Sequence, residues 1–255
     1  MISPTFTQRL RAGDTLLTSF IKTPAHAVVE IAGDAGLDGV VLDTEHAPFD
    51  AASLDRTLLA CRAASVAGLV RVADQRPATL LQALDLGADG LVLPHIVGAE
   101  QARHVLAATR YRDGCRGFSN SPRAGGYGRA NLAEHLAAED GRHAMVAQIE
   151  DREALDNLAA IAAVAEIDCL LVGRADLSVS LGASRLDDPR VEDATLRAID
   201  AARSAGKTAG IFVASLEDLD RFAERGVTLF ILGSDQALLR AGWSQQVRHL
   251  RNRAR

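Results

Sequence analysis

The chain has 255 residues, of which 48% are hydrophobic and 4% are aromatic, and its formal net charge is −5. This length fits a single barrel of alternating strands and helices, with a core built mainly from aliphatic side chains. The negative charge gives no electrostatic reason to expect nucleic acid or an anionic membrane as a partner, and no apolar run is long enough to span a bilayer.

The three cysteines, Cys61, Cys115 and Cys169, are far apart in the sequence and lack the paired spacing of a metal site. An odd number of isolated cysteines is typical of reduced thiols in a cytosolic protein. The first residues have no basic region followed by an apolar run, so they do not resemble a signal peptide. We therefore expect a soluble, cytoplasmic protein.

Short β-branched runs recur along the chain, and Ala- and Leu-rich segments of helical periodicity lie between most of them. The eight candidate strands are 16–19, 40–43, 69–71, 90–93, 145–149, 169–172, 208–213 and 229–232. Eight alternating units favour a closed (β/α)8 barrel, also called a TIM barrel, over an open doubly wound sheet. Because no linker or low-complexity segment divides the sequence, we expect one domain over residues 1–255.

The second candidate strand ends in the polar segment 43–48, which contains Asp43, Glu45 and His46 before Pro48 stops the extended run. In parallel α/β folds, the carboxyl ends of the strands carry the catalytic and ligand-binding side chains. The simpler alternative is a charged loop that only terminates the strand. Similar clusters after other strands favour the functional interpretation.

Arg71 ends the third strand, where its guanidinium could bind a carboxylate or stabilise a developing oxyanion. A structural salt bridge to a neighbouring acidic loop is the alternative. Glu150 and Asp176 follow the fifth and sixth strands, so their carboxylates could converge on a hard divalent ion such as Mg²⁺ or Mn²⁺. Alternatively, Asp176 caps a helix that begins at Leu177.

Two further features have open interpretations. His95, after the fourth strand, faces the same mouth but has no clear partner in the sequence. Segment 111–129 is rich in glycine and arginine and too irregular for a regular element. A loop of this length is usually functional or disordered, and it could contribute to the active site or an interface, or lie at the opposite face of the barrel.

The segments 43–48 (DTEHAP), 148–150 (QIE) and 173–178 (GRADLS) occur together in an order and spacing that resemble the HpcH/HpaI aldolase family. The resemblance extends from about residue 13 to residue 239. It implies a metal-dependent class II pyruvate aldolase similar to 4-hydroxy-2-oxoheptanedioate aldolase. Such an enzyme cleaves or forms 4-hydroxy-2-oxo acids, to or from pyruvate or a related 2-oxo acid and an aldehyde.

The resemblance also implies roles for individual residues. Glu150 and Asp176 match the two metal ligands, with Mg²⁺ or Mn²⁺ expected and Co²⁺ or Zn²⁺ as further candidates. His46 matches the histidine that performs acid/base catalysis, and Asp85 matches the carboxylate paired with it. Arg71 matches the arginine that binds the substrate and stabilises the enolate.

Asp43 matches an acidic residue near the metal-bound water, and it completes the predicted catalytic set. The substrate-binding set contains Gln148, together with Gly173 and Ala175, whose backbone corresponds to the cradle for the pyruvate carboxylate. Arg174 belongs to this set, but it stands where the family commonly has proline. We therefore expect altered carboxylate binding or acceptor choice at this position.

Two alternatives to an aldolase are considered. The first is another metal-dependent carbon–carbon lyase of the malyl- or citramalyl-CoA lyase type, although no distinct basic groove for CoA is evident. The second is a non-catalytic barrel that serves as a binding or scaffold protein. This alternative would be favoured if the carboxylate pair failed to bind metal.

The last predicted helix, about 236–251, carries apolar residues at near-helical spacing. They are Leu238, Leu239, Trp243, Val247 and Leu250. The family resemblance implies a homo-oligomer, a hexamer, in which this terminal helix packs on a neighbouring subunit. The same residues would be expected if the helix folded onto its own barrel.

Overall fold

Eight parallel strands form a closed barrel in chain order, and β8 pairs with β1 to complete it. The computed structural model describes residues 4–139 and 141–253. All eight predicted strands are present, which confirms the (β/α)8 fold. Their bounds are β1 Leu16–Ile21, β2 Gly39–Asp43, β3 Ala67–Arg71, β4 Gly90–Leu93, β5 Ala144–Ile149, β6 Cys169–Val172, β7 Thr208–Val213 and β8 Leu229–Ser234.

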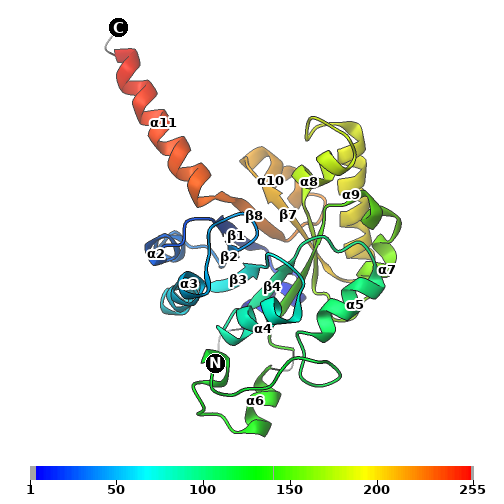
Figure 1. The fold of residues 1–255 in the computed structure, drawn as a ribbon. Helices are drawn as coiled ribbons and strands as arrows, with labels where there is room; N and C mark the ends of the chain where they lie inside the picture. The colour runs from blue at the N-terminus through cyan, green and yellow to red at the C-terminus, as the bar shows by residue number, and fades with distance from the viewer. Residues whose placement is uncertain (1–3, 140, 254–255) are drawn as a thin grey trace.

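Helices surround the barrel, as Figure 1 shows. Their bounds in the first half of the chain are α1 Phe6–Ala12, α2 His26–Asp34, α3 Ala51–Ala63, α4 Pro77–Asp85, α5 Ala99–Ala107, the short 3-10 helix η1 Arg123–Gly125 and α6 Leu132–Glu139. In the second half they are the 3-10 helix η2 Arg152–Asp156, α7 Leu158–Ala162, α8 Arg174–Ser180, α9 Pro189–Ser204, α10 Leu216–Ala223 and α11 Asp235–Arg253.

Side-chain alternation along the strands determines which residues reach the mouth of the barrel. In β2, Val41 packs in the interior cluster, whereas Val40 and Leu42 pack between the strands and the helices. Since alternate residues of a strand face the same side, Asp43 also points inward, at the carboxyl end. Arg71 is its register partner on β3. The same alternation directs Gln148 inward, two residues after Val146.

The amino-terminal end of the barrel is closed by α1, which the sequence analysis did not predict. Phe6 and Leu10 belong to the cluster that fills the barrel interior. The backbone carbonyl of Leu10 accepts a hydrogen bond of 2.7 Å from the hydroxyl of Thr208, at the start of β7. This plug leaves the carboxyl end as the open end of the barrel.

Segment 111–129 contains only the short helix η1 as a regular helix or strand, and it lies against the outer helices. Arg123 donates hydrogen bonds to the carbonyls of Asp55 in α3 and Leu86 after α4. Because α4 runs from the mouth toward the amino-terminal end, its last residues and this loop lie away from the mouth. These contacts favour the interpretation in which segment 111–129 lies at the face of the barrel opposite the mouth.

Helix α11 extends away from the ring of helices and contacts the barrel at β1 and β8. The predicted apolar residues on it are exposed, including Leu238 and Leu250 at 64% and 65% and Trp243 at 65%. None of the helices within residues 4–139 and 141–253 has the length and apolar character needed to cross a membrane.

Candidate active site

A cavity of about 360 Å³ opens at the carboxyl ends of the strands. Seven of the predicted site residues line it, together with an apolar wall and two polar residues that had no predicted role, Lys22 and Ser234. The lining comprises Phe20, Lys22, His46, Arg71, Gln148, Leu171, Val172, Gly173, Arg174, Ala175, Asp176, Phe212, Ile231 and Ser234. Most of the predicted substrate and catalytic positions therefore share one cavity.

Asp43 and Arg71 form a buried bidentate ion pair beneath this cavity. The guanidinium Nε and Nη2 of Arg71 donate to the two carboxylate oxygens of Asp43 at 3.0 and 2.8 Å. Burial alone would raise the pKa of Asp43, but the hydrogen bonds and charge of Arg71 outweigh it and hold that pKa below its usual value. Asp43 is therefore an anion that fixes the orientation of Arg71.

Two further contacts shape this pair. Lys22, directly after β1, places its Nζ 3.1 Å from an Asp43 oxygen, and the Arg71 guanidinium lies 4.6 Å from the centre of the Phe20 ring. Lys22 was not predicted as a site residue, although Leu16 and Phe20 of β1 face inward and residue 22 continues that alternation. Lys22 and Arg71 together present positive charge to the cavity.

His46 lies at the rim, where its side chain is 55% exposed and its Nε2 is 3.7 Å from Glu45 Oε2. Its backbone N–H donates to Asp43 Oδ1 at 3.1 Å. Glu45 also contacts Arg71, whose Nη1 is 3.3 Å from Oε2. The exposed imidazole is therefore positioned to exchange protons with a molecule in the cavity.

Glu150 is buried directly after β5, and its carboxylate contacts the amide nitrogen of Gln148. Burial raises the pKa of Glu150, and the negative charge of Asp176 raises it further. The backbone N–H and the imidazole of His95 lower this pKa, but by less than the increase. A cation between the two carboxylates would relieve both effects. The electrostatics therefore fit a divalent ion at Glu150 and Asp176.

The surroundings of Glu150 agree with a cation site. The side-chain oxygen of Gln148 is buried without a hydrogen-bond partner among the described residues, although buried acceptors are normally paired. Gly173 has no Cβ, and a Cβ there would lie 2.9 Å from Glu150 Oε2 and 3.1 Å from the Gln148 amide nitrogen. Gly173 therefore keeps space open beside these oxygen donors, which are the kind that Mg²⁺ or Mn²⁺ prefers.

Helix α8 begins at Arg174, with Gly173 in the N-cap position, and Asp176 lies in its first turn. The alternative in which Asp176 caps a helix starting at Leu177 is therefore wrong. The first intrahelical bond is donated by the Leu177 N–H to the Gly173 carbonyl. The preceding N–H groups, including that of Ala175, are not used within the helix and adjoin the cavity.

The side chain of Arg174 is directed toward α10. Its Nη1 donates to Asp218 Oδ2 at 3.1 Å, and its guanidinium lies 5.1 Å from the centre of the Phe222 ring. Arg174 is 8% exposed. The guanidinium of Arg174 therefore links α8 to α10. Arg174 lines the cavity through its position in the first turn of α8.

Asp85 is the predicted site residue that the structure does not place at the mouth. It is the last residue of α4, and at 1.5 Å per residue this helix carries it about 13 Å from the helix start at the mouth. There it accepts a hydrogen bond of 2.9 Å from Arg116. Within one chain, Asp85 is therefore not the partner of His46, whose imidazole instead lies near the carboxylate of Glu45.

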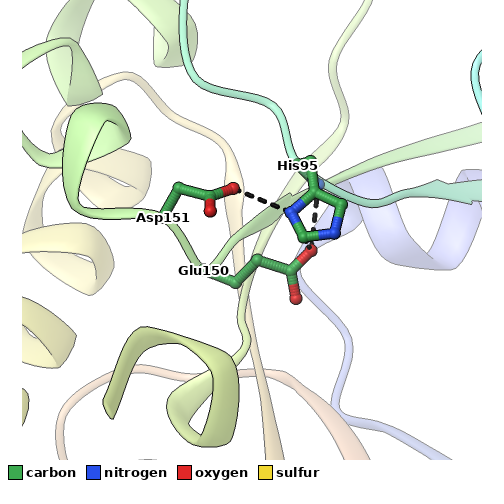
Figure 2. Close-up of side chains that lie close together, drawn as sticks. All are labelled: His95, Glu150 and Asp151. Carbon is green, nitrogen blue, oxygen red and sulfur yellow. Dashed lines mark hydrogen bonds and ion pairs between the residues drawn. The ribbon is translucent and has the colours of Figure 1, made fainter. Parts of the chain in front are cut away.

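His95, by contrast, gains partners that the sequence did not reveal (Figure 2). Its Nδ1 is 2.9 Å from Asp151 Oδ2, its backbone N–H donates to Glu150 Oε1 at 2.9 Å, and its Nε2 is 3.6 Å from Glu45. The hydrogen bond that the His95 imidazole donates to the Asp151 carboxylate raises the pKa of His95. Glu150 and Asp151 are 55 and 56 residues away in the sequence, so spacing gave no signal for these contacts.

Comparisons with known proteins decide the family. The HpcH/HpaI aldolase/citrate lyase family matches residues 17–241. A 5-keto-4-deoxy-D-glucarate aldolase from Shigella boydii serotype 18 is 35% identical over 214 residues, which cover 83% of this chain and 82% of that protein. The chain belongs to this family. It is accordingly an enzyme, a carbon–carbon lyase of the class II aldolase type.

Solved structures agree with this assignment. An HpcH/HpaI aldolase/citrate lyase family protein from Burkholderia cenocepacia J2315 is 31% identical, with a TM-score of 0.92 and coverage of 96% of this chain and 98% of that one. The citrate synthase SbnG is 26% identical, with a TM-score of 0.89 and coverage of 98% of each chain. The same fold therefore occurs in an aldolase/citrate lyase family protein and in a citrate synthase.

Proposed function

We propose that this family member is a metal-dependent pyruvate aldolase that cleaves or forms 4-hydroxy-2-oxo acids, to or from pyruvate or a related 2-oxo acid and an aldehyde. The observation that carries the proposal is the composition of one cavity. Asp176, Arg71, the exposed His46 and Gln148, whose side-chain oxygen has no partner among the described residues, line this cavity. Glu150 contacts the Gln148 amide behind it, and the charge of Asp176 acts on Glu150.

The metal would be held by Glu150 and Asp176, with Mg²⁺ or Mn²⁺ expected first and Co²⁺ or Zn²⁺ as further candidates. When bound, it supplies Lewis-acid polarisation of the 2-oxo group, which makes the enolate less costly to form. The open space at Gly173 and the N–H groups at Ala175 are suited to the substrate carboxylate.

The residues of the chain perform the remaining chemistry. Arg71, held by Asp43, directs positive charge toward the oxygen on which negative charge develops. His46 accepts the proton of the 4-hydroxyl group during cleavage and returns it during condensation. Its contact in the chain is Glu45. A proposed pairing with Asp85 could form only if Asp85 came from a second copy of the chain.

The test of the proposal is a metal-dependence assay of pyruvate release. The purified enzyme is treated with a chelator, dialysed and supplied with Mg²⁺, Mn²⁺, Co²⁺ or Zn²⁺, and a panel of 4-hydroxy-2-oxo acids is examined. We expect pyruvate release to stop on chelation and to return with metal. Cleavage of citramalyl-CoA to pyruvate and acetyl-CoA, or of malyl-CoA to glyoxylate and acetyl-CoA, with no cleavage of the panel compounds, would instead favour the CoA lyase alternative.

We also propose that the chain forms a cytoplasmic homo-oligomer, a hexamer, in which α11 packs on a neighbouring subunit. Helix α11 has little support from its own barrel and exposes Leu238, Trp243 and Leu250. Burying such side chains removes apolar area from water, which stabilises an interface. Light scattering that shows only monomer at micromolar concentration would refute the assembly without affecting the proposed chemistry.

A further inference from the structure

Three donor atoms, one from the loop after β4 and two from the turn after β5, converge beside Glu150. They are His95 Nδ1, Glu150 Oε1 and Asp151 Oδ2, and all three lie within 4.8 Å of one another. Figure 2 shows the imidazole between the two carboxylates. Adjacent ligands of an octahedral ion are about 3 Å apart when each metal–ligand bond is about 2.1 Å. The Nδ1 separations of 2.9 Å from Asp151 and 3.5 Å from Glu150 are close to that value.

The local negative charge also favours the binding of a second cation. Within residues 4–139 and 141–253, Glu150, Asp151 and Asp176 form no ion pair with a lysine or arginine. The first two pair with His95. One divalent ion would leave a net negative charge on three clustered carboxylates.

The backbone of His95 holds the imidazole in this place. Its φ of 55° is in the left-handed region, which non-glycine residues adopt infrequently. This conformation accompanies the hydrogen bond from its N–H to Glu150 Oε1, while Nδ1 faces Asp151. A neutral imidazole nitrogen suits ions from Mn²⁺ to Zn²⁺ better than it suits Mg²⁺, which prefers oxygen ligands.

We propose that His95, Glu150 and Asp151 form a second divalent-cation position, which favours first-row transition ions and shares Glu150 with the proposed Glu150–Asp176 site. Glu150 would act as a bridging carboxylate, with Oε1 directed to the second position and Oε2 on the side of Gln148 and Gly173. The ion replaces the proton between Nδ1 and Asp151, and that proton is released to solvent.

The test is the stoichiometry of metal binding, measured by titration calorimetry of the metal-free protein with MnCl₂ and separately with MgCl₂. We expect two Mn²⁺ ions and one Mg²⁺ ion per chain. His95→Gly removes the imidazole at a position whose positive φ glycine adopts freely, and it should lower the Mn²⁺ count to one. Asp176→Asn should also leave one Mn²⁺, and His46→Ala, the matched control, should keep two.

A spectroscopic measurement identifies the ligand directly. Pulsed electron paramagnetic resonance of Mn²⁺ bound to the Asp176→Asn variant should show ¹⁴N coupling that His95→Gly abolishes and His46→Ala retains. A single Mn²⁺ that survives His95→Gly, or the absence of ¹⁴N coupling, would overturn the second position. If only one Mn²⁺ binds, and it is lost in His95→Gly but kept in Asp176→Asn, the second position would be supported and the Glu150–Asp176 site would be wrong.

Discussion

At the scale of single residues, Asp43 is the structural anchor of the cavity. Its carboxylate is fully buried and contacts both Arg71 and Lys22. A buried charge is tolerated only when partners compensate for its loss of hydration. The ion pair therefore fixes the guanidinium in one orientation, and the remaining Nη1 faces Glu45 at 3.3 Å.

Asp43→Asn should lower the free energy of unfolding by about 3–5 kcal/mol, because it leaves buried positive charge without its partner. It should also lower kcat, because Arg71 loses its fixed orientation. Denaturant unfolding and steady-state kinetics measure the two effects. The control is Asp14→Asn, which removes a partly exposed ion pair with Arg9 and should cost no more than about 1 kcal/mol. Equal effects of both substitutions would contradict the anchoring role.

Residues differed in how far the sequence revealed their surroundings. Asp43, Arg71 and Glu150 were predictable as site residues because each ends or directly follows an apolar strand. The contacts of His95 were not, since they depend on a left-handed backbone and on carboxylates more than 50 residues away. The position of Asp85 could be judged only after the direction of α4 was known.

At the scale of elements, α6 is tied to the barrel by a buried charge cluster away from the mouth. Glu139, its last residue, contacts Arg116 at 3.0 Å, and Arg142 and His143 at 2.9 Å each. Burial acts to raise the pKa of Glu139, but these positive partners outweigh it and lower the pKa from 4.5 to about 2. The ionised carboxylate therefore stabilises this face of the barrel.

The sign of the pH effect follows from this pKa. Because the folded-state value lies below the unfolded one, the stabilisation is complete above about pH 5 and is lost as the pH falls toward 2. A shift of this size corresponds to about 3 kcal/mol. Glu139→Gln should lower the free energy of unfolding by about 2–3 kcal/mol at pH 7, and by much less near pH 3. A pH-independent difference in urea unfolding would show that the charge is not the cause.

The strands were easier to predict than the segments between β4 and β5. A parallel barrel buries both faces of its strands, so each strand appears as a short apolar run. Segment 111–129 has no such pattern, because its position depends on Arg123 contacts with α3 and α4. Helix α1 was missed because it is short and its burial depends on closing the barrel interior.

At the scale of the whole molecule, α11 is the main feature that one copy of the chain leaves without packing partners. It extends from the barrel with its apolar residues exposed (Figure 1). Its position was predicted from sequence, since apolar residues recur at helical spacing. Whether these residues face their own barrel or a neighbour could not be predicted, because both arrangements need the same pattern.

Trp243→Glu should weaken the proposed hexamer, because it places a charge in an apolar interface. Light scattering coupled to gel filtration should then show smaller species, whereas the folded barrel, measured by circular dichroism, should persist. Gln245→Glu, at another exposed position of α11, is the matched control and should leave the assembly intact. An unchanged particle mass for Trp243→Glu would exclude Trp243 from the interface.

The most direct test of the central claim is metal-dependent exchange of the pyruvate methyl hydrogens in D₂O, followed by NMR. We expect exchange that stops on chelation, returns with Mg²⁺ or Mn²⁺, and is largely lost in Glu150→Gln and Asp176→Asn. His46→Ala should keep its metal affinity and lower aldol cleavage by roughly 10²–10⁴-fold, with a smaller effect on exchange. Exchange that persists without metal, or full activity in Asp176→Asn together with loss of metal binding in His46→Ala, would contradict the proposed site.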